Sequence, residues 1–287
     1  MKKLFPEHDR EPDVSGGYVL KVDRADPGDS GFSQGGQTMR YVYPKEEDIE
    51  RPERNSQEQF VSDYFRAMGR ALNGSDFKDP NEGYAKYIDV DAAIDHHLLN
   101  VLAFNVDGLR LSGYMHLPRG GKLTFGPIWD FDRALGSTDG RDSNPNTWRS
   151  RSGDRGTDFF NYPWWNRMFR DIDFFQKYID RFQSLRVEEL SDVHLNGLVD
   201  AMADELREAQ KRNLDRWNQR PRSQFGRTYQ GEINHMKDWL GERVEFMESQ
   251  FVAPPRFELS SGQLDPGGLV SLSSLGGGEI YYTVDGS

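Results

Sequence analysis

Acidic residues flank two β-like stretches of the chain, and their spacing is the clearest sign of chemistry in the sequence. Asp107 lies just before a stretch over residues 109–117, and Asp130 and Asp132 follow a second stretch over residues 122–129. The connecting Pro-Arg-Gly-Gly has the residue types that hairpin turns require. The two stretches are therefore predicted to pair as antiparallel strands, so that the first begins where the second ends.

The predicted register brings these carboxylates together. If Leu117 pairs with Lys122, Asp107 lies near Asp132. Neighbouring strands are about 4.8 Å apart, so the carboxylates of Asp107 and of Asp130 or Asp132 can reach a common centre. Magnesium is commonly held by one or two carboxylates together with the phosphates of a nucleotide. One aspartate can then bind the metal while another orients an attacking hydroxyl group.

Two other interpretations of these acids stay open on geometry alone. In the first, Asp107 caps a helix end, and Asp130 and Asp132 are ordinary strand-end acids. In the second, two carboxylates flank a glycosidic bond, as in glycoside hydrolases. No other feature of the sequence indicates a sugar cleft.

Composition narrows the possible functions. Aromatic residues make up 13% of the 287 residues and can bury much area, so one large two-lobed domain or two domains are both reasonable. The formal charge of -11 disfavours general attraction to nucleic acids or anionic membranes, and a bound polyanion needs a local basic pocket. The absence of cysteine excludes disulfides, thiolate zinc sites and thiol nucleophiles. No signal-peptide pattern and no membrane-spanning apolar stretch is present.

Local patterns predict a β-rich beginning followed by helices. The β-type runs over 18–22 and 39–43 lie between turn-forming residues and indicate two or three strands. A helix is predicted over 56–73, opened by the capping pattern Ser-x-x-Gln. A second, broadly apolar helix is predicted from Asp89 or Asp91 to about residue 105.

The later part of the chain changes character twice. Residues 136–158 are polar and aperiodic, which is typical of a long surface loop. Helical periodicity then predicts an all-helical segment up to Phe251, with Trp164, Trp165 and Trp217 in its core. From residue 253 glycine-separated β-type runs predict a new β domain. A β-sandwich normally has about seven strands, so residues 253–287 can hold only its beginning.

Three motifs occur in order along the chain. They are Tyr-Ile-Asp-Val-Asp-Ala-Ala-Ile-Asp over 87–95, Asn-Val-Asp over 105–107 and Gly-Pro-Ile-Trp-Asp-Phe-Asp-Arg over 126–133. The set resembles the spore-coat CotH kinase family, from about residue 16 to residue 251. Members of that family are secreted or surface-associated atypical protein kinases that use ATP and a divalent ion to phosphorylate serine or threonine. The resemblance implies an α+β, protein-kinase-like fold with a small β-rich N-terminal part and a large helical C-lobe.

The resemblance also implies roles for individual residues. Asp107, in the Asn-x-Asp motif, matches the catalytic acid, with Asn105 in support. Asp130, the first aspartate of Trp-Asp-Phe-Asp, matches the magnesium ligand, and Asp132 supports it. Ser112 stands five residues after Asp107, where kinases carry a metal-binding asparagine, and its hydroxyl is a weaker ligand.

Binding of ATP with Mg²⁺ or Mn²⁺ needs cationic residues near the phosphates. Lys21 and Lys45 are the candidate phosphate-binding lysines, and Arg133 is placed to neutralise transferring phosphate charge. Family members have more chain ahead of the Gly-x-Tyr strand, so residues 1–252 are interpreted as an N-terminally incomplete kinase-like domain. Residues 253–287 resemble the start of the β-sandwich module at the C-terminus of chitobiases and hexosaminidases.

The resemblance implies a bacterial chain at the cell surface or outside the cell. Its expected partner is a secreted or surface protein substrate, with polysaccharide as a candidate ligand of the C-terminal module, and neither nucleic-acid binding nor membrane insertion is expected. The alternative hypothesis is a non-catalytic surface or adhesion protein that retains the kinase-like fold.

Overall fold

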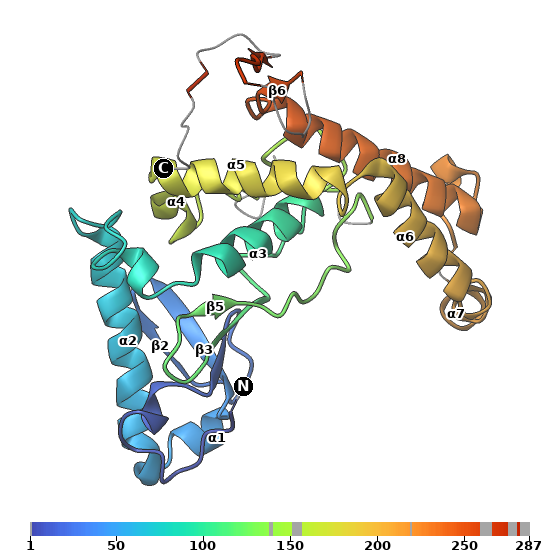
Figure 1. The fold of residues 1–287 in the computed structure, drawn as a ribbon. Coiled ribbons are helices and arrows are strands. Elements are labelled where there is room, and N and C mark those ends of the chain that lie inside the picture. Colours follow the sequence, from blue (N-terminus) through green and yellow to red (C-terminus); the bar gives the residue numbers. More distant parts are fainter. Residues whose placement is uncertain are drawn as a thin grey trace.

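A five-stranded antiparallel sheet forms the N-terminal part of the molecule (Figure 1). The computed structural model describes residues 2–137, 140–150, 157–218, 220–258, 266–274 and 280–281. The strands follow the order β2-β3-β1-β4-β5 and comprise β1 (Tyr18–Val22), β2 (Gly31–Gln34), β3 (Gln37–Tyr43), β4 (Gly113–Leu117) and β5 (Thr124–Phe125). The central strand β1 buries every second side chain, so its apolar alternation builds the core face of the sheet.

Helices make up most of the rest of the described chain. They are α1 (Glu46–Ile49), α2 (Asn55–Asn73), α3 (Val90–Leu102), α4 (Trp165–Met168), α5 (Ile172–Val187), α6 (Asp192–Glu205), α7 (Ala209–Trp217) and α8 (Tyr229–Ser249). Short 3₁₀ turns lie at Asp13–Ser15, Pro52–Arg54, Tyr84–Lys86 and Ser223–Phe225. Helix α2 lies beside the sheet, whereas α5, α6 and α8 form the helical part on the other side of α3 (Figure 1). The predicted α+β class and the helical later segment are confirmed.

Helix α2 forms where apolar periodicity predicts it, but it begins differently. Its buried side chains recur at helical spacing, at Val61, Phe65, Met68 and Leu72. The predicted capping interaction of Ser56 is wrong, since the helix has no side-chain N-cap. Instead, a preceding 3₁₀ turn leads into it, and the buried Arg54 donates to Gln57 Oε1 at 2.7 Å.

Helix α3 is the element that leads to the predicted catalytic loop. Asp89 caps it by accepting a hydrogen bond from the backbone N–H of Ala92 at 3.1 Å, as an N-cap aspartate does. The helix packs against α5 and α8 as well as β5, which explains its broad apolar surface. It ends at Leu102, and Phe104 then takes a left-handed conformation with φ 48°. The chain therefore turns sharply just before Asn105.

One hydrophobic cluster connects the sheet with the helices. It includes Leu20 of β1 and Phe65 of α2, and it continues through Trp165 to Tyr178 of α5 and Val244 of α8. A shared core of this kind is expected of one large two-lobed domain. The predicted boundary between residues 252 and 253 stays a prediction.

Three expectations about the later chain need correction or lie outside the described residues. Within the described part of 136–158, Asp142 and Thr157 are buried, so this polar segment is not wholly a surface loop. Trp217 is 64% exposed and does not belong to the core. Beyond residue 253 the described residues form only the short pair β6 (Arg256–Phe257) and β7 (Leu272–Ser273), which does not show a sandwich. Across the described ranges, no helix combines the length and apolarity needed to span a bilayer.

Candidate active site

Strands β4 and β5 form the predicted hairpin with a register shifted by one residue. His116 pairs with Thr124, whereas the predicted register placed it opposite Leu123. Leu123 instead bridges to the segment before α3, where its N–H donates to the carbonyl oxygen of Tyr87 at 2.8 Å. The predicted register of the hairpin is therefore wrong by one residue, although the hairpin itself is present.

The strands are also shorter than predicted, and loops position the acids. Leu109 and Ser112 have left-handed φ values of 70° and 50°, which interrupt the first predicted strand. Pro127 has no N–H to donate to a sheet, and Gly126 before it has φ 121°, so the second strand ends at Phe125. The acids are consequently held by the loops 103–112 and 126–136 rather than by paired strands.

Asn105 joins these two loops. Its side-chain oxygen accepts from the backbone N–H groups of Asp107 at 3.3 Å and Gly108 at 3.2 Å, which fixes the local turn. Its Nδ2 donates to the carbonyl oxygen of Asp130 at 3.3 Å. Gly108 is required here, because a Cβ at this position would lie 2.1 Å from Asn100 Oδ1. Asn105 is therefore a buried support for both predicted functional aspartates.

Three arginines surround the carboxylate of Asp107, which is 9% exposed. Arg133 Nη1 lies 2.8 Å from Oδ2, and Arg110 Nη2 lies 3.0 Å from Oδ1. Arg141 Nη2 is 3.8 Å from the same Oδ1, and its side chain is nearly buried. Both carboxylate oxygens are thus engaged by guanidinium groups, whose planar donors suit carboxylates and phosphates equally.

Asp130 and Asp132 lie together at the exposed edge of this cluster. Ser112 Oγ donates to Asp130 Oδ2 at 3.1 Å. The pKa of Asp132 is raised because its carboxyl loses hydration and because it hydrogen-bonds to, and is repelled by, Asp130. Asp107 raises it further, and Arg133 lowers it. Within the described residues no set of three or more acidic, histidine or cysteine side chains is arranged for a metal ion, so the donors available are this pair and the Ser112 hydroxyl.

The two candidate lysines occupy different ends of the sheet. Lys21 lies on β1, one residue from the end next to the Asp107 loop, and its Nζ is 3.5 Å from Asp29 Oδ2 and 4.0 Å from Asp23 Oδ2. Lys45 follows β3 at the opposite end of the sheet and is exposed. The structure therefore brings Lys21 toward the acids but not Lys45.

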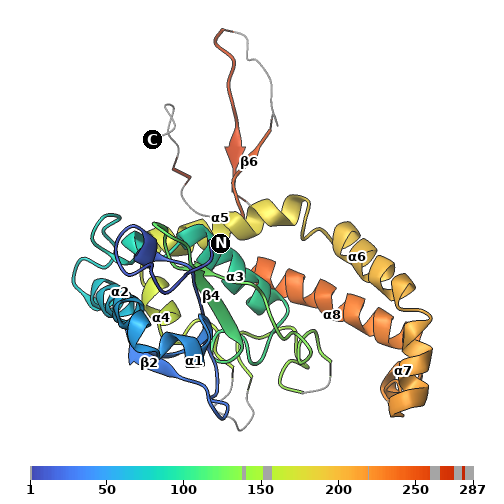
Figure 2. The ribbon, with the colours of Figure 1, turned by 90° about the horizontal axis from the view of Figure 1, so that it is seen from below.

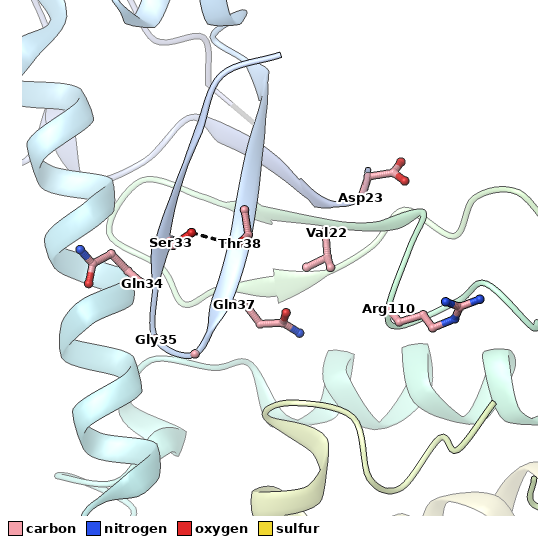
Figure 3. A pocket seen from close by; sticks show the side chains of 9 residues that line it. Val22, Asp23, Ser33, Gln34, Gly35, Gln37, Thr38 and Arg110 are labelled. Atoms are coloured by element: carbon pink, nitrogen blue, oxygen red, sulfur yellow. Dashed lines mark hydrogen bonds between the residues drawn. The ribbon is translucent and has the colours of Figure 1, made fainter. Parts of the chain in front are cut away.

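A cavity of about 570 Å³ lies between Arg110 and the turn that joins β2 to β3 (Figure 3). Gly35 and Gly36 form this turn with φ values of 63° and 84°. Trp164 Nε1 holds the carbonyl oxygen of Gly35 at 2.6 Å. Figure 3 shows the turn on one side of the cavity and Arg110 on the other. Since Arg110 also contacts Asp107, it connects the cavity to the predicted catalytic loop.

Sequence reasoning did not assign Arg110, Arg141 or the Gly35–Gly36 turn to the site. The paired glycines were visible as turn-forming residues, and the alternation on both sides of them predicts a hairpin. The arginines carry no comparable signal, because most arginines of a soluble chain lie on its surface.

Comparison with known protein families places most of the chain. A family model described as CotH kinase protein matches residues 5–247, which is most of the chain. The chain belongs to the CotH kinase protein family. The resemblance on the three motifs is thereby confirmed at the level of the family, and a kinase-like function follows from it. The matched range ends before the C-terminal segment, so the chitobiase-type module is not shown. No curated protein matches the chain.

Proposed function

We propose that this chain is a protein kinase that transfers the γ-phosphoryl group of ATP to serine or threonine hydroxyl groups of a protein. The observation that carries the proposal is the meeting of Asp107 with Asp130 and Asp132 beside three arginines, in a chain of the CotH kinase family. The cavity under the Gly35 turn adds room for a ligand at the same place.

Asp107 is assigned the role of orienting the acceptor hydroxyl and receiving its proton. Its position is fixed by Asn105 and by the guanidinium groups of Arg110 and Arg133. The same guanidinium groups are suited to phosphate oxygens, which carry more charge than one carboxylate. Arrival of a phosphate group therefore draws these arginines from Asp107 and leaves its oxygens able to accept a proton.

Asp130 and Asp132 are assigned to the metal. When bound, ATP supplies the phosphoryl group, and Mg²⁺ or Mn²⁺ neutralises its developing charge. The donor set fits a hard cation. Loss of hydration and the neighbouring Asp130 carboxyl raise the pKa of Asp132, and a cation held by these two residues would relieve their repulsion. Both side chains are exposed, which leaves room for the waters that magnesium retains. Ser112, through its contact with Asp130, is the third candidate donor.

The setting of the reaction is proposed from the family alone. We infer a bacterial protein that acts outside the cell or at its surface, including the spore coat, on a secreted or surface protein. A polysaccharide ligand for residues 253–287 belongs to the same proposal.

A non-catalytic surface protein is the second candidate, and two observations favour it. Both oxygens of Asp107 are engaged by arginines, which is the arrangement of a structural ion-pair cluster as much as of a resting active site. Ser112 also stands where kinases carry an asparagine ligand. The two candidates differ in whether nucleotide binding breaks the ion pairs between Asp107 and the arginines.

The test measures transfer of radiolabelled phosphate from ATP, with Mg²⁺ or Mn²⁺, to a generic acceptor protein and to the chain itself. Asp107→Asn and Asp130→Asn are each expected to lower transfer by about a hundredfold or more, because each removes a group acting on the transferred phosphoryl or the hydroxyl. Asp238→Asn changes an exposed aspartate on α8 and serves as the matched control.

Nucleotide binding is measured separately by thermal shift, since a ligand at a hundred times its dissociation constant adds about 2.7 kcal/mol to stability. Asp107→Asn is expected to keep the metal-dependent shift that Asp130→Asn loses. Transfer that survives equally in both variants refutes the assigned roles. A metal-dependent shift without any transfer by the unmodified chain supports the non-catalytic candidate instead.

A further inference from the structure

A basic segment projects from this acidic protein at the end of the molecule farthest from the sheet. Between Arg207 and Arg227 the sequence has seven basic residues and two acidic ones, although the whole chain has a formal charge of -11. The segment includes α7, which buries none of its side chains. Both views show α7 beyond the ends of α6 and α8 (Figures 1 and 2). We refer to the described residues of 207–227 as the basic arm.

Several cations of the basic arm lack an acidic partner. Arg207 pairs with Asp204, and Arg212 pairs with Glu208 at 3.2 Å, both on exposed surface. By contrast, the described residues offer no ion pair to four others, which are Lys211, Arg216, Arg220 and Arg227. Such exposed, uncompensated charge in an acidic protein creates a local positive field.

Apolar side chains lie next to these charges. On α6, Leu198, Met202 and Leu206 follow one another at intervals of four residues and are 43%, 62% and 53% exposed. Leu195 and Val199 belong to the same apolar stripe of α6, nearer its start, and pack on the core. Trp217, at the end of α7, is 64% exposed, and the Arg216 guanidinium lies 5.2 Å from its ring. Exposed apolar groups bordered by charge are typical of interaction surfaces.

The base of the basic arm is fixed rather than loose. Arg222 forms an ion pair with Glu232 of α8 at 2.7 Å. Its Nη1 also donates to the carbonyl oxygens of Gly136, at 2.8 Å, and Ser137. Ser137 Oγ in turn donates to the carbonyl oxygen of Asp132 at 3.2 Å. The arm is therefore held on the loop that follows the predicted metal ligands.

We propose that the basic arm, together with the exposed apolar residues of α6, binds an acidic polypeptide segment that carries apolar side chains. Acidic side chains of this segment pair with the four cations that form no ion pair with the described residues, and its apolar side chains cover Met202, Leu206 and Trp217. Aromatic and arginine side chains supply most of the binding energy at interfaces of this kind. A short segment touches the arm alone, and so avoids the acidic body of the protein.

An anionic membrane fits the same chemistry less well. A flat bilayer that contacts the arm also faces the neighbouring acidic surface, and like charges repel over about 8 Å at physiological ionic strength. Binding at the arm requires no phosphoryl transfer, so its test is independent of the kinase assay.

The test uses a short fluorescent peptide that contains glutamate and leucine at helical spacing, and a counterpart with lysine in place of glutamate. Fluorescence anisotropy is expected to show saturable binding of the acidic peptide only, and weaker binding at high ionic strength. Reversal of charge in Lys211→Glu with Arg216→Glu is expected to weaken binding about tenfold or more. Trp217→Ala is expected to weaken it by a similar factor.

The matched control is Lys2→Glu with Arg10→Glu, which changes the net charge equally at two exposed positions outside the arm. Equal weakening by this control, or equal binding of the lysine peptide, overturns the proposal. It is also overturned if the acidic peptide does not bind, and phosphatidylserine vesicles bound through the same side chains would then identify a lipid surface. Circular dichroism of each variant shows whether the fold is retained.

Discussion

Two buried histidines on α3 make the protein sensitive to acid. His97 is fully buried, with its ring nitrogens 3.1 Å from Tyr178 Oη and 3.1 Å from the carbonyl oxygen of Phe159. His96 is 6% exposed and packs against the ring of Phe125. Burial lowers the pKa of His97 to about 3 and that of His96 to about 4. Both rings are therefore neutral in the folded protein down to strongly acidic pH.

The sign and size of the effect follow from linkage. An unfolded histidine has its ordinary pKa of 6.5. Below that pH both histidines bind protons in the unfolded chain but stay neutral in the folded chain. The contribution of the neutral histidines to the free energy of unfolding is therefore complete above their unfolded pKa. It is lost as the pH falls from there toward their pKa values in the folded protein. Well below pH 6.5 each histidine contributes about 1.4 kcal/mol per pH unit. The slope is smaller near pH 6.5 itself, so both together remove roughly 3 kcal/mol between pH 6.5 and pH 5. That is a large share of a typical domain stability of about 5–15 kcal/mol.

Urea denaturation at neutral and mildly acidic pH checks this prediction. His97→Gln keeps a hydrogen-bonding side chain but cannot titrate, so it is expected to lose about half as much stability on acidification as the unmodified protein. The comparison is between the two pH values for each protein, which cancels any packing defect of the variant. His194 is exposed on α6, and His194→Asn is expected to keep the original pH dependence. If His97→Gln keeps it too, the neutral buried ring is not the cause, and the reasoning fails.

Three further substitutions test how the fold holds the candidate site. Arg243→Met removes a fully buried guanidinium that donates to three backbone carbonyls, and is expected to cost about 3 kcal/mol or more in urea denaturation. Gly35→Ala places a Cβ 2.7 Å from a carbonyl oxygen of α2, whereas the Cβ of Gly36→Ala meets no atom within 4 Å. Both glycines have left-handed backbone conformations, so Gly35→Ala is expected to lower the free energy of unfolding by about 1 kcal/mol more than Gly36→Ala. Ser112→Asn is expected to strengthen, and Ser112→Ala to weaken, the metal-dependent thermal shift, and an unchanged shift in both would contradict its place beside the metal.

The sequence predicts the helices before the site better than the site itself. Helix α3 is predicted within a few residues, because its apolar period and the capping Asp89 are local signals. The hairpin is predicted too, but its register depends on Leu123, which pairs with Tyr87 far away in the chain. A turn sequence alone does not contain that contact, so the register of β4 and β5 is predicted one residue out of place.

The surroundings of Asp107 show a second limit of local patterns. Arg110, Arg133 and Arg141 come from three segments and converge only when the loops after α3 and β5 have folded. Each of them is an ordinary charged residue in the sequence. The Asn-x-Asp and Trp-Asp-Phe-Asp motifs could locate the acids, whereas the charge that surrounds them is a product of tertiary structure.

Trp217 shows why periodicity leaves the partner of a helix undetermined. Its spacing from other apolar residues predicts a face that is buried, and the core of the same chain is the usual partner. Among the residues that the structure describes, α7 buries none of its side chains, and Trp217 stays 64% exposed beside basic side chains that form no ion pair there. A helical period reports that a face is suited to burial, but not which molecule covers it. The incorrect placement of Trp217 in the core and the proposed binding of an acidic segment thus come from the same apolar pattern. The peptide experiment decides whether another polypeptide covers this apolar face.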